Sequence, residues 1–317
     1  MKRYLSIAVL SALCAPQLAY AQSPAAQAAA DAFSAPAPPP PNEPPPAPVA
    51  AADANLAPDR EIDQPEDGEL LIAGPLHEAF AEQFTIEPTP GLIVNKQPPE
   101  PIDEIPPEYR PDGSHVAWVP GYWGWDVDRD DFVWVTGIWR QAPPDRNWVP
   151  GYWAETREGY QWISGFWAPN DSEEVVYLPA PPQPIEAQPS SEPPSDNHFW
   201  VPGQWTYINN DYQWRAGYWA VGYPDWVWVP ERYVWTPVGY IYRPGYWDYQ
   251  LPDRGTIFCP VYWGTTTRVA NYRFRPTYVV NTGATLLANL FVYPRYNHYY
   301  FGNYYTSRWI GQTIYPW

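Results

Sequence analysis

The sequence predicts an all-β fold: an antiparallel meander of short aromatic strands with Gly/Pro kinks, arranged in two repeat blocks. Three observations predict it. A Trp-x-x-Gly-x-Trp motif recurs at steps near 14 residues, and a fixed period of this kind marks a repeat architecture. Each unit is rich in Trp, Tyr and Val, which favour strands. Acidic, Asn or Gly residues separate the units, as turns between antiparallel strands require.

The chain opens with the features of a signal peptide, which we assign to residues 1–21. Lys2 and Arg3 precede an apolar run, and a small-x-small site ends at Ala21, so the mature chain is expected to begin at Gln22. The alternative is an uncleaved anchor, but the apolar run is short for a membrane span. No later run reaches the ~18 apolar residues of a spanning helix, so no transmembrane helix is expected after signal removal.

Two segments precede the repeats. Residues 22–67 are mostly Ala, Pro and acidic residues, which cannot bury a core, so a disordered Pro/Ala-rich acidic spacer is expected there. Residues 68–111 are expected to form a weakly structured island. Within it, Leu76, Phe80 and Phe84 fall four residues apart, which predicts a short helix. GLIVNK, at residues 91–96, predicts a short strand.

The repeat motifs fall into a first block at 112–169 and a second at 198–250, joined by a Pro-rich linker at 170–197. The residue before the motif Gly alternates between Pro and a small residue, which indicates a strand pair of about 28 residues as the true unit. The last pair is irregular, with Glu231 in place of Gly and Tyr242 in place of Trp. The motif residues, interpreted as structural with possible ligand contact, are Trp118, Gly121, Trp123, Trp134, Gly137, Trp139, Trp148, Gly151, Trp153, Trp162, Gly165, Trp167, Trp200, Gly203, Trp205, Trp214, Gly217, Trp219, Tyr242, Gly245 and Trp247.

The spacing of the two motif tryptophans predicts a kink between them. Residues five apart in a flat strand point to opposite faces. A β-bulge at the Gly would insert one residue and bring both rings to the same face. Gly tolerates the dihedral angles of a bulge, and a preceding Pro fits there because it lacks an N–H. We therefore expect a bulge at each motif Gly.

Two roles are open for the tryptophans. Units of about 14 residues are too short to supply a core of large aliphatic side chains, and stacked Trp pairs could supply it instead. In that case the rings are buried, and we expect burial for Trp123, Trp153 and Trp205. The other role is an exposed platform on which sugar rings stack. Exposure of the rings distinguishes the two.

Residues 251–317 are expected to form an aromatic, basic, mostly β C-terminal module with one short helix, predicted over residues 282–292. This segment has no acidic residue from Arg254 onward, whereas the whole chain has a formal net charge of −17. Basic residues interleaved with aromatics could suit nucleic acid. The export signal and the negative net charge of the whole chain exclude nucleic acid as a partner.

The sequence offers no catalytic, metal or cofactor site. The four histidines, at 77, 115, 198 and 298, are isolated, and no His/Cys spacing suits zinc. Residues 126–131 (DVDRDD) resemble the start of a calcium loop but lack its Gly and distal Glu. Signal cleavage would remove Cys14, which leaves Cys259 without an internal disulfide partner. Paired carboxylates for glycoside hydrolysis have no sequence signature.

The W-x-x-G-x-W units resemble the WXXGXW (YXWGXW) repeat family of exported bacterial proteins. The resemblance extends to planctomycete-type members in HEAFAE (77–82), RPGYWDYQL (243–251) and HYYFGNYY (298–305). It implies an exported or envelope location and brings no activity or site residue with it. The departures at Glu231 and Tyr242 weaken the match in the last pair of units.

Together these observations predict an exported, non-enzymatic structural or interaction protein of the bacterial cell envelope, located in the periplasm, at the cell surface or outside the cell. Its partner would be an unknown envelope protein or a polysaccharide. The alternative is a polysaccharide-binding protein that uses exposed Trp and Tyr platforms. No cofactor is expected.

Overall fold

The computed structural model describes residues 68–317 except 86, 114, 172–174, 186–187 and 265–272. All described residues belong to one compact unit, which spans Ala37–Trp317. The predicted signal peptide and acidic spacer lie outside the described residues. The predicted all-β fold is confirmed, since nearly every element is a short strand.

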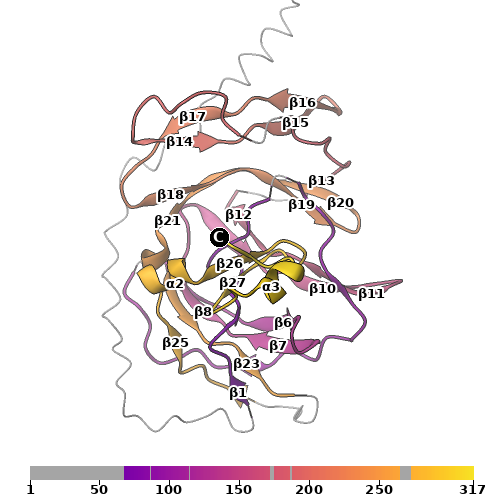
Figure 1. Ribbon diagram of the computed structural model, residues 1–317, viewed down its shortest axis with the longest axis vertical. Helices are drawn as coiled ribbons and strands as arrows, with labels where there is room; N and C mark the ends of the chain where they lie inside the picture. The colour runs from indigo at the N-terminus through magenta and orange to yellow at the C-terminus, as the bar shows by residue number, and fades with distance from the viewer. Residues whose placement is uncertain (1–67, 86, 114, 172–174, 186–187, 265–272) are drawn as a thin grey trace, which may run out of the picture. The chain divides into compact units, whose positions relative to one another are not determined.

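Each pair of repeat motifs forms one bent hairpin, and the described chain has four of them (Figure 1). The two-strand unit predicted from the alternation before Gly is therefore correct. Every hairpin consists of an outer strand pair and an inner strand pair that ends in the turn. The first hairpin comprises β5 (Val116–Val119), β6 (Tyr122–Asp126), β7 (Asp131–Val135) and β8 (Ile138–Gln141), and the second β9 (Arg146–Val149), β10 (Tyr152–Thr156), β11 (Gly159–Ile163) and β12 (Phe166–Pro169).

The second block repeats this arrangement. Its third hairpin comprises β14 (His198–Val201), β15 (Gln204–Ile208), β16 (Asp211–Arg215) and β17 (Tyr218–Val221). Its fourth comprises β18 (Trp226–Val229), β19 (Arg232–Thr236), β20 (Gly239–Arg243) and β21 (Tyr246–Tyr249). In all four hairpins the outer strands pair with each other and the inner strands pair with each other, antiparallel throughout.

The predicted bulge is wrong. In the first hairpin, Val119 pairs with Ile138 and the next paired residues are Tyr122 and Val135. The same number of residues is passed over on each strand, so the register continues unchanged and no extra residue is inserted. A bulge would have offset the two strands by one. The kink is instead a symmetric break, with Pro120-Gly121 facing Thr136-Gly137.

Additional strands extend three of the hairpins. β22 (Gly255–Phe258) and β23 (Val261–Tyr262) lie along β8 and β7 of the first hairpin, and they break at Cys259-Pro260 in step with it. β3 (Ile93–Val94), the strand predicted in GLIVNK, pairs with β11. β13 (Tyr177–Leu178) pairs with β20 in the equivalent register of the fourth hairpin. The two blocks therefore match beyond the motif itself.

The C-terminal module forms most of a further four-stranded sheet, in the order β2 (Gly74–Pro75), β27 (His298–Phe301), β26 (Leu290–Tyr293) and β28 (Tyr315–Pro316). The helix predicted over 282–292 is confined to α2 (Ala284–Ala288), because the chain turns into β26 and buries Phe291 completely. A second short helix, α3, was not predicted. The remaining elements are β1 (Glu69–Leu70), β4 (Asp103–Glu104), η1 (Leu251–Asp253), β24 (Arg273–Phe274), β25 (Val279–Val280) and α3 (Ser307–Gly311).

The helix predicted from Leu76, Phe80 and Phe84 is a single turn. The backbone N–H of Phe80 bonds to the carbonyl of His77, but those of Glu78 and Ala79 bond to side chains, as described below. Leu76 and Phe80 are still completely or almost completely buried. The apolar spacing thus identified core residues, but the single turn does not continue into a helix.

Of the three clusters of buried side chains in the described chain, the smallest packs Val201 of the third hairpin against Trp228 and Trp247 of the fourth, and the two larger ones form most of the core. One gathers aromatic rings of the first two hairpins with Tyr and Phe side chains of β26, β27 and the loop between them. The other joins the 76–81 turn to residues of the first, second and fourth hairpins, β22 and α2. The first block and the C-terminal module therefore share a core.

Candidate functional site

The motif glycines are required because partner tryptophans lie directly over them. A Cβ atom at Gly137 would lie 2.5 Å from Cζ2 of Trp118, and one at Gly165 would lie 2.4 Å from Cζ2 of Trp148. At Gly217 the corresponding distance, to Trp200, is 2.2 Å. None of the seven motif glycines has a positive φ. The Gly thus provides room for a ring from the opposite strand rather than an unusual backbone angle.

The motif tryptophans also face one another across the strands. The Trp pairs are 118/139, 123/134, 148/167, 153/162, 200/219, 205/214 and 228/247, with ring centroids 5.2–5.4 Å apart. Most of them meet edge to face, the geometry that aromatic quadrupoles favour. Trp123 is buried, as expected, whereas Trp153 and Trp205 are half-buried. Each motif Trp is buried or half-buried, so no exposed coplanar row is present.

The two irregular motif residues stand at the positions that form the ring-over-Gly contact in the other hairpins. In the other hairpins, the first Trp of the second motif covers the Gly of the first motif, as Trp214 covers Gly203. The equivalent positions in the fourth hairpin are Tyr242 and Glu231. A smaller ring thus stands where a larger residue replaces Gly. The carboxylate of Glu231 connects the third and fourth hairpins, because it accepts a hydrogen bond from Arg215 of the third hairpin.

A buried carboxylate closes the kink of the first hairpin. Both oxygens belong to Glu104, which precedes the hairpin in sequence. They accept hydrogen bonds from the N–H groups of Gly121 (2.9 Å) and Gly137 (3.0 Å) and from the indole of Trp134 (3.0 Å). These donors lie at the break in the ladder, where no strand partner is available. Burial raises the pKa of Glu104.

Glu78 does the same in the second hairpin. Its carboxylate accepts from the indole of Trp162 and from the N–H of Gly165, both at 2.9 Å. Burial raises its pKa to about 7, against the opposing effect of these donors. Neither glutamate can be identified from the sequence. Glu104 lies 17 residues before Gly121 and Glu78 lies 87 residues before Gly165, and no local pattern connects them with the kinks.

A short proline-rich motif precedes each block. PPEPI at residues 98–102 and PPQPI at 181–185 differ at one position only. The indole of Trp123 donates to the carbonyl of Glu100 at 2.9 Å, and the indole of Trp205 donates to the carbonyl of Gln183 at 2.9 Å. The middle residue of each motif is therefore held by the equivalent Trp of the following hairpin. Comparison of the segments before the two blocks could have revealed this match.

The same position connects the two hairpins within each block. The indole of Trp153 donates to the carbonyl of Trp123 at 2.8 Å, and the hydroxyl of Tyr233 donates to the carbonyl of Trp205 at 2.8 Å. Each block is thus a stack of three layers: a proline-rich strand, a first hairpin and a second hairpin. One aromatic donor per layer reaches back to the layer before it.

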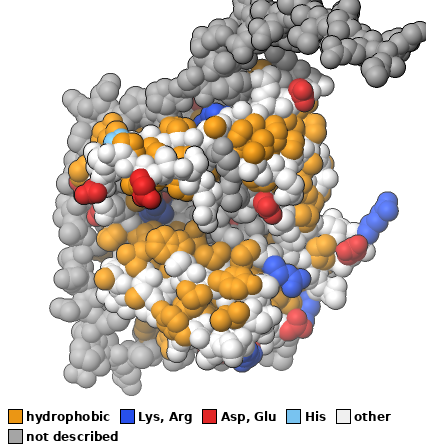
Figure 2. Space-filling view, turned by 45° about the horizontal axis from the view of Figure 1, so that its top comes forward, with side chains coloured by type: hydrophobic (Ala, Val, Ile, Leu, Met, Phe, Trp, Pro, Cys, Tyr) orange, Lys and Arg blue, Asp and Glu red, His pale blue; other side chains and the backbone are white. Residues whose placement is uncertain are grey.

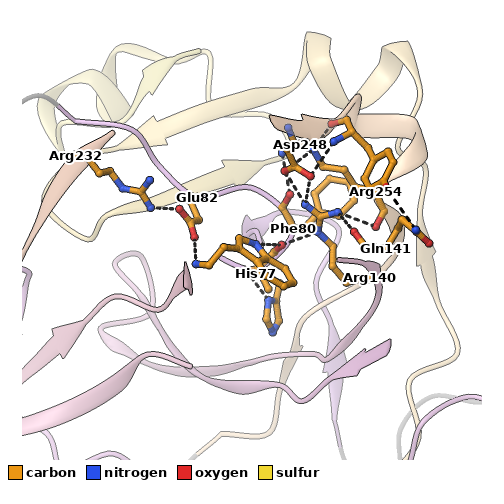
Figure 3. Close-up of polar contacts among 11 residues, drawn as sticks. His77, Phe80, Glu82, Arg140, Gln141, Arg232, Asp248 and Arg254 are labelled. Carbon is orange, nitrogen blue, oxygen red and sulfur yellow. Dashed lines mark hydrogen bonds and ion pairs between the residues drawn. The ribbon is translucent and has the colours of Figure 1, made fainter. Parts of the chain in front are cut away.

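Buried ion pairs connect the first block, the fourth hairpin and the C-terminal module (Figure 3). Arg140 donates two hydrogen bonds of 2.7 Å to Asp248, and Nε of Arg254 lies 3.2 Å from the same carboxylate. The two guanidinium groups also bond to carbonyls of the 77–81 turn, those of Ala79 and Phe80. A second buried pair joins Glu82 of the same segment to Arg232 of the fourth hairpin.

Two buried histidines lie beside Glu78. His77 Nε2 is 3.1 Å from the carbonyl of Pro120 while its Nδ1 accepts from the N–H of Ala79. His298 Nδ1 is 3.0 Å from the carbonyl of Tyr296 and its Nε2 is 2.7 Å from the Tyr122 hydroxyl. Each ring therefore fits one neutral tautomer. Burial lowers the pKa of His77 to about 4 and that of His298 to about 3.

The remaining reactive groups give no catalytic arrangement in the described part of the chain. Burial raises the pKa of the Cys259 thiol to about 11, so it is protonated and a poor nucleophile at neutral pH. No group of three or more His, Cys, Asp or Glu side chains among the described residues could hold a metal ion. The described helices are also too short or too polar to cross a membrane.

Among the described residues, two clefts with room for a ligand lie between hairpins. One has a volume of about 610 Å³ and lies between the first two hairpins, with Pro98, Pro99 and Pro101 on its wall. Its other lining residues are mostly Trp, Tyr and Pro. The second cleft, of about 630 Å³, lies between the second and fourth hairpins. Both volumes fall within the range of roughly 300–1,000 Å³ for small-ligand sites.

Comparison with known proteins supports the repeat and adds no activity. A family model described as the WXXGXW repeat, with two copies, matches residues 147–168, 196–220 and 238–250. No curated protein and no solved structure matches the chain. The matched segments lie in the second, third and fourth hairpins. Each W-x-x-G-x-W unit there forms one arm of a bent hairpin, made of an outer and an inner strand, and its Gly lies beneath a partner Trp.

Proposed function

We propose that this chain is an exported, non-enzymatic structural or interaction protein of the bacterial cell envelope. The observation that carries the proposal is the use of the motif tryptophans. Their rings cover the glycines of partner strands and their indoles hold neighbouring layers together. Rings committed in this way serve as internal joints of a scaffold.

The surface supports an interaction role. Figure 2 shows hydrophobic side chains gathered in broad patches on one face, with only scattered charged side chains between them. Large apolar side chains exposed on the described chain include Ile72 at 89%, Val238 at 71% and Trp317 at 65%. Contiguous apolar surface of this kind commonly marks binding sites for other macromolecules.

Export is the second part of the proposal. It rests on the charged start, the apolar run and the cleavage site at Ala21, and on the resemblance to exported planctomycete-type proteins. N-terminal sequencing of the protein from an envelope fraction of its host should return Gln22 as the first residue. Recovery of the chain with Met1 from the cytosol would refute export.

The scaffold role is tested by Trp153→Ala. Loss of this half-buried ring and its hydrogen bond to Trp123 should lower the free energy of unfolding by about 3–5 kcal/mol. Tyr152→Ala is the matched control, because Tyr152 is 55% exposed and its loss should change stability little. Thermal unfolding is measured together with a pull-down on insoluble polysaccharides. A stable Trp153→Ala protein that lost polysaccharide binding would reverse the assignment.

Polysaccharide binding is the second candidate, and one observation favours it. The 630 Å³ cleft combines the rings of Trp228, Tyr246 and Trp247 with the polar side chains of Asp145 and Asp171. Aromatic faces next to carboxylates suit the apolar faces and hydroxyl groups of a sugar. Binding of soluble oligosaccharides by the wild type, abolished by Asp145→Ala, would support this candidate.

A further inference from the structure

We propose that the 610 Å³ cleft between the first two hairpins binds a proline-rich strand of a partner protein, in the polyproline II conformation. The proposal rests on the interaction role proposed above and specifies the chemistry of the partner. It follows from three features of the cleft: a proline-rich strand that already lies against it, a free aromatic donor, and an exposed aromatic ring.

The chain provides its own examples of this recognition. Pro98, Pro99 and Pro101 line the cleft, and between them the carbonyl of Glu100 accepts the indole N–H of Trp123. Polyproline II strands have no internal hydrogen bonds, so their carbonyls are available to such donors, and their proline rings pack on aromatic faces. The hairpin surface thus has the chemistry that recognises this conformation.

The second block shows that this arrangement is not accidental. The carbonyl of Gln183, in the matching PPQPI motif, accepts the indole N–H of Trp205. Nearby, the hydroxyl of Tyr212 donates to the carbonyl of Pro179 at 2.6 Å. Two hairpins from different parts of the chain therefore hold proline-rich strands through equivalent Trp residues.

The cleft, with its volume of about 610 Å³, has room for a second strand. Trp148 lines it, and its indole N–H has no acceptor within the described chain; this nitrogen is not among the buried unpaired atoms, so it can reach a ligand. Tyr152 also lines the cleft and is 55% exposed. Pro120 and Pro150 lie at the kinks beside these rings and are exposed. A carbonyl of the incoming strand can accept from Trp148 as that of Glu100 does from Trp123.

The lining favours a proline-rich strand over a sugar. The cleft walls contain seven Trp and two Tyr side chains, together with prolines, small residues and Val119, and they include no carboxylate. Their polar side chains are those of Asn147, of Arg140, which is paired with Asp248, and of Arg146, which donates to the carbonyl of Gly245. A sugar needs several polar partners for its hydroxyl groups. A proline-rich strand needs aromatic faces and one donor for each carbonyl that it presents.

The experiment measures fluorescence anisotropy of a labelled peptide with the sequence of residues 35–48, APAPPPPNEPPPAP, titrated with the full chain. We expect saturable binding, and none to a peptide in which every Pro is Ala. Trp148→Phe removes the free N–H but keeps a ring, and should weaken binding by about tenfold, the effect of losing one hydrogen bond with part of a ring contact. Tyr152→Ala should weaken it as well.

Trp200→Phe is the matched control. Trp200 has the same place in the third hairpin, covers Gly217 as Trp148 covers Gly165, and does not line the cleft. It should therefore leave peptide binding unchanged while causing a similar loss of stability. Absence of binding, equal weakening by the two Phe variants, or equal binding of the all-Ala peptide would each overturn the proposal. Binding of soluble oligosaccharides but not of the peptide would show that the cleft binds sugar and would refute this proposal. The scaffold role is tested separately, by the stability of Trp153→Ala.

Discussion

At the scale of single residues, the Gly of each motif is fixed by what lies above it. Seven glycines have ordinary backbone angles, so their conformational freedom is not the reason for them. Gly151 illustrates the reason: a Cβ there would lie 2.6 Å from both the carbonyl of Ile163 and Cζ2 of Trp162. Neither atom can move without disturbing the hairpin, because one is backbone and the other belongs to a fully packed ring.

Gly151→Ala should therefore lower the free energy of unfolding by about 1–3 kcal/mol through overpacking. Gly311→Ala is the control, because no atom lies within 4 Å of a Cβ at that position. Its effect should stay within about 0.5 kcal/mol. Urea unfolding of both variants decides the matter, and equal midpoints would refute the steric explanation.

The buried histidines predict how stability depends on pH. His77 and His298 titrate near 4 and 3 in the folded protein, against 6.5 when unfolded. From about pH 4 to 6.5 the unfolded chain binds more protons at these sites, so they make stability rise with pH. Glu78 acts in the opposite direction between its unfolded value of 4.5 and its folded value of about 7, because there the folded chain binds more protons.

Between pH 4.5 and 6.5, His298→Gln should therefore reduce the increase of melting temperature with pH, and Glu78→Gln should enhance it. Differential scanning calorimetry at several pH values measures the slopes. Parallel profiles for the wild type and His298→Gln would contradict the assignment.

At the scale of the element, the bent hairpin is one unit with two ladders and a symmetric break. The break leaves backbone donors unpaired, and a glutamate from outside the hairpin accepts from them in both hairpins of the first block. An unpaired buried donor would cost roughly 1–3 kcal/mol. The kink thus depends on a residue that lies far away in the sequence.

The irregular fourth hairpin provides a test of the ring-over-Gly contact. Tyr242→Trp should lower the free energy of unfolding by about 1–3 kcal/mol, because the larger ring meets Glu231. Glu231→Gly should also destabilise, since Arg215 loses its carboxylate partner. If the two positions touch, the double variant should be more stable than the sum of the single effects by at least about 0.5 kcal/mol. Strict additivity in this double-mutant cycle would show that they do not.

At the scale of the whole molecule, residues from distant parts of the chain meet at buried charges. Asp248 of the fourth hairpin binds Arg140 of the first and Arg254 of the C-terminal module, and the carbonyls of the 77–81 turn complete the cluster. Within the described residues these pairs join the first hairpin to the fourth, which also share the buried cluster around the 76–81 turn. Removing one partner of such a buried pair leaves a charge unsatisfied.

Asp248→Asn should accordingly lower the free energy of unfolding by about 3–5 kcal/mol. Asp103→Asn breaks an exposed pair with Arg273 and should cost at most about 1 kcal/mol. Chemical denaturation followed by Trp fluorescence compares the two. A small effect of Asp248→Asn would mean that the cluster does not hold these segments together.

The sequence alone determined the strand class, the pairing of motifs into 28-residue units and the irregularity at Glu231 and Tyr242, because period, composition and turn residues are local properties of the chain. It also identified Leu76 and Phe80 as core residues, but it placed them on a helix where the structure has a single turn. Only the tertiary structure decided that the kink is symmetric, that Glu104 and Glu78 close it, and that Trp123 and Trp205 hold proline-rich strands. Those features depend on atoms brought together from separate parts of the chain, up to 87 positions apart, and register, burial and hydrogen-bond partners between such parts leave no periodic mark in one sequence.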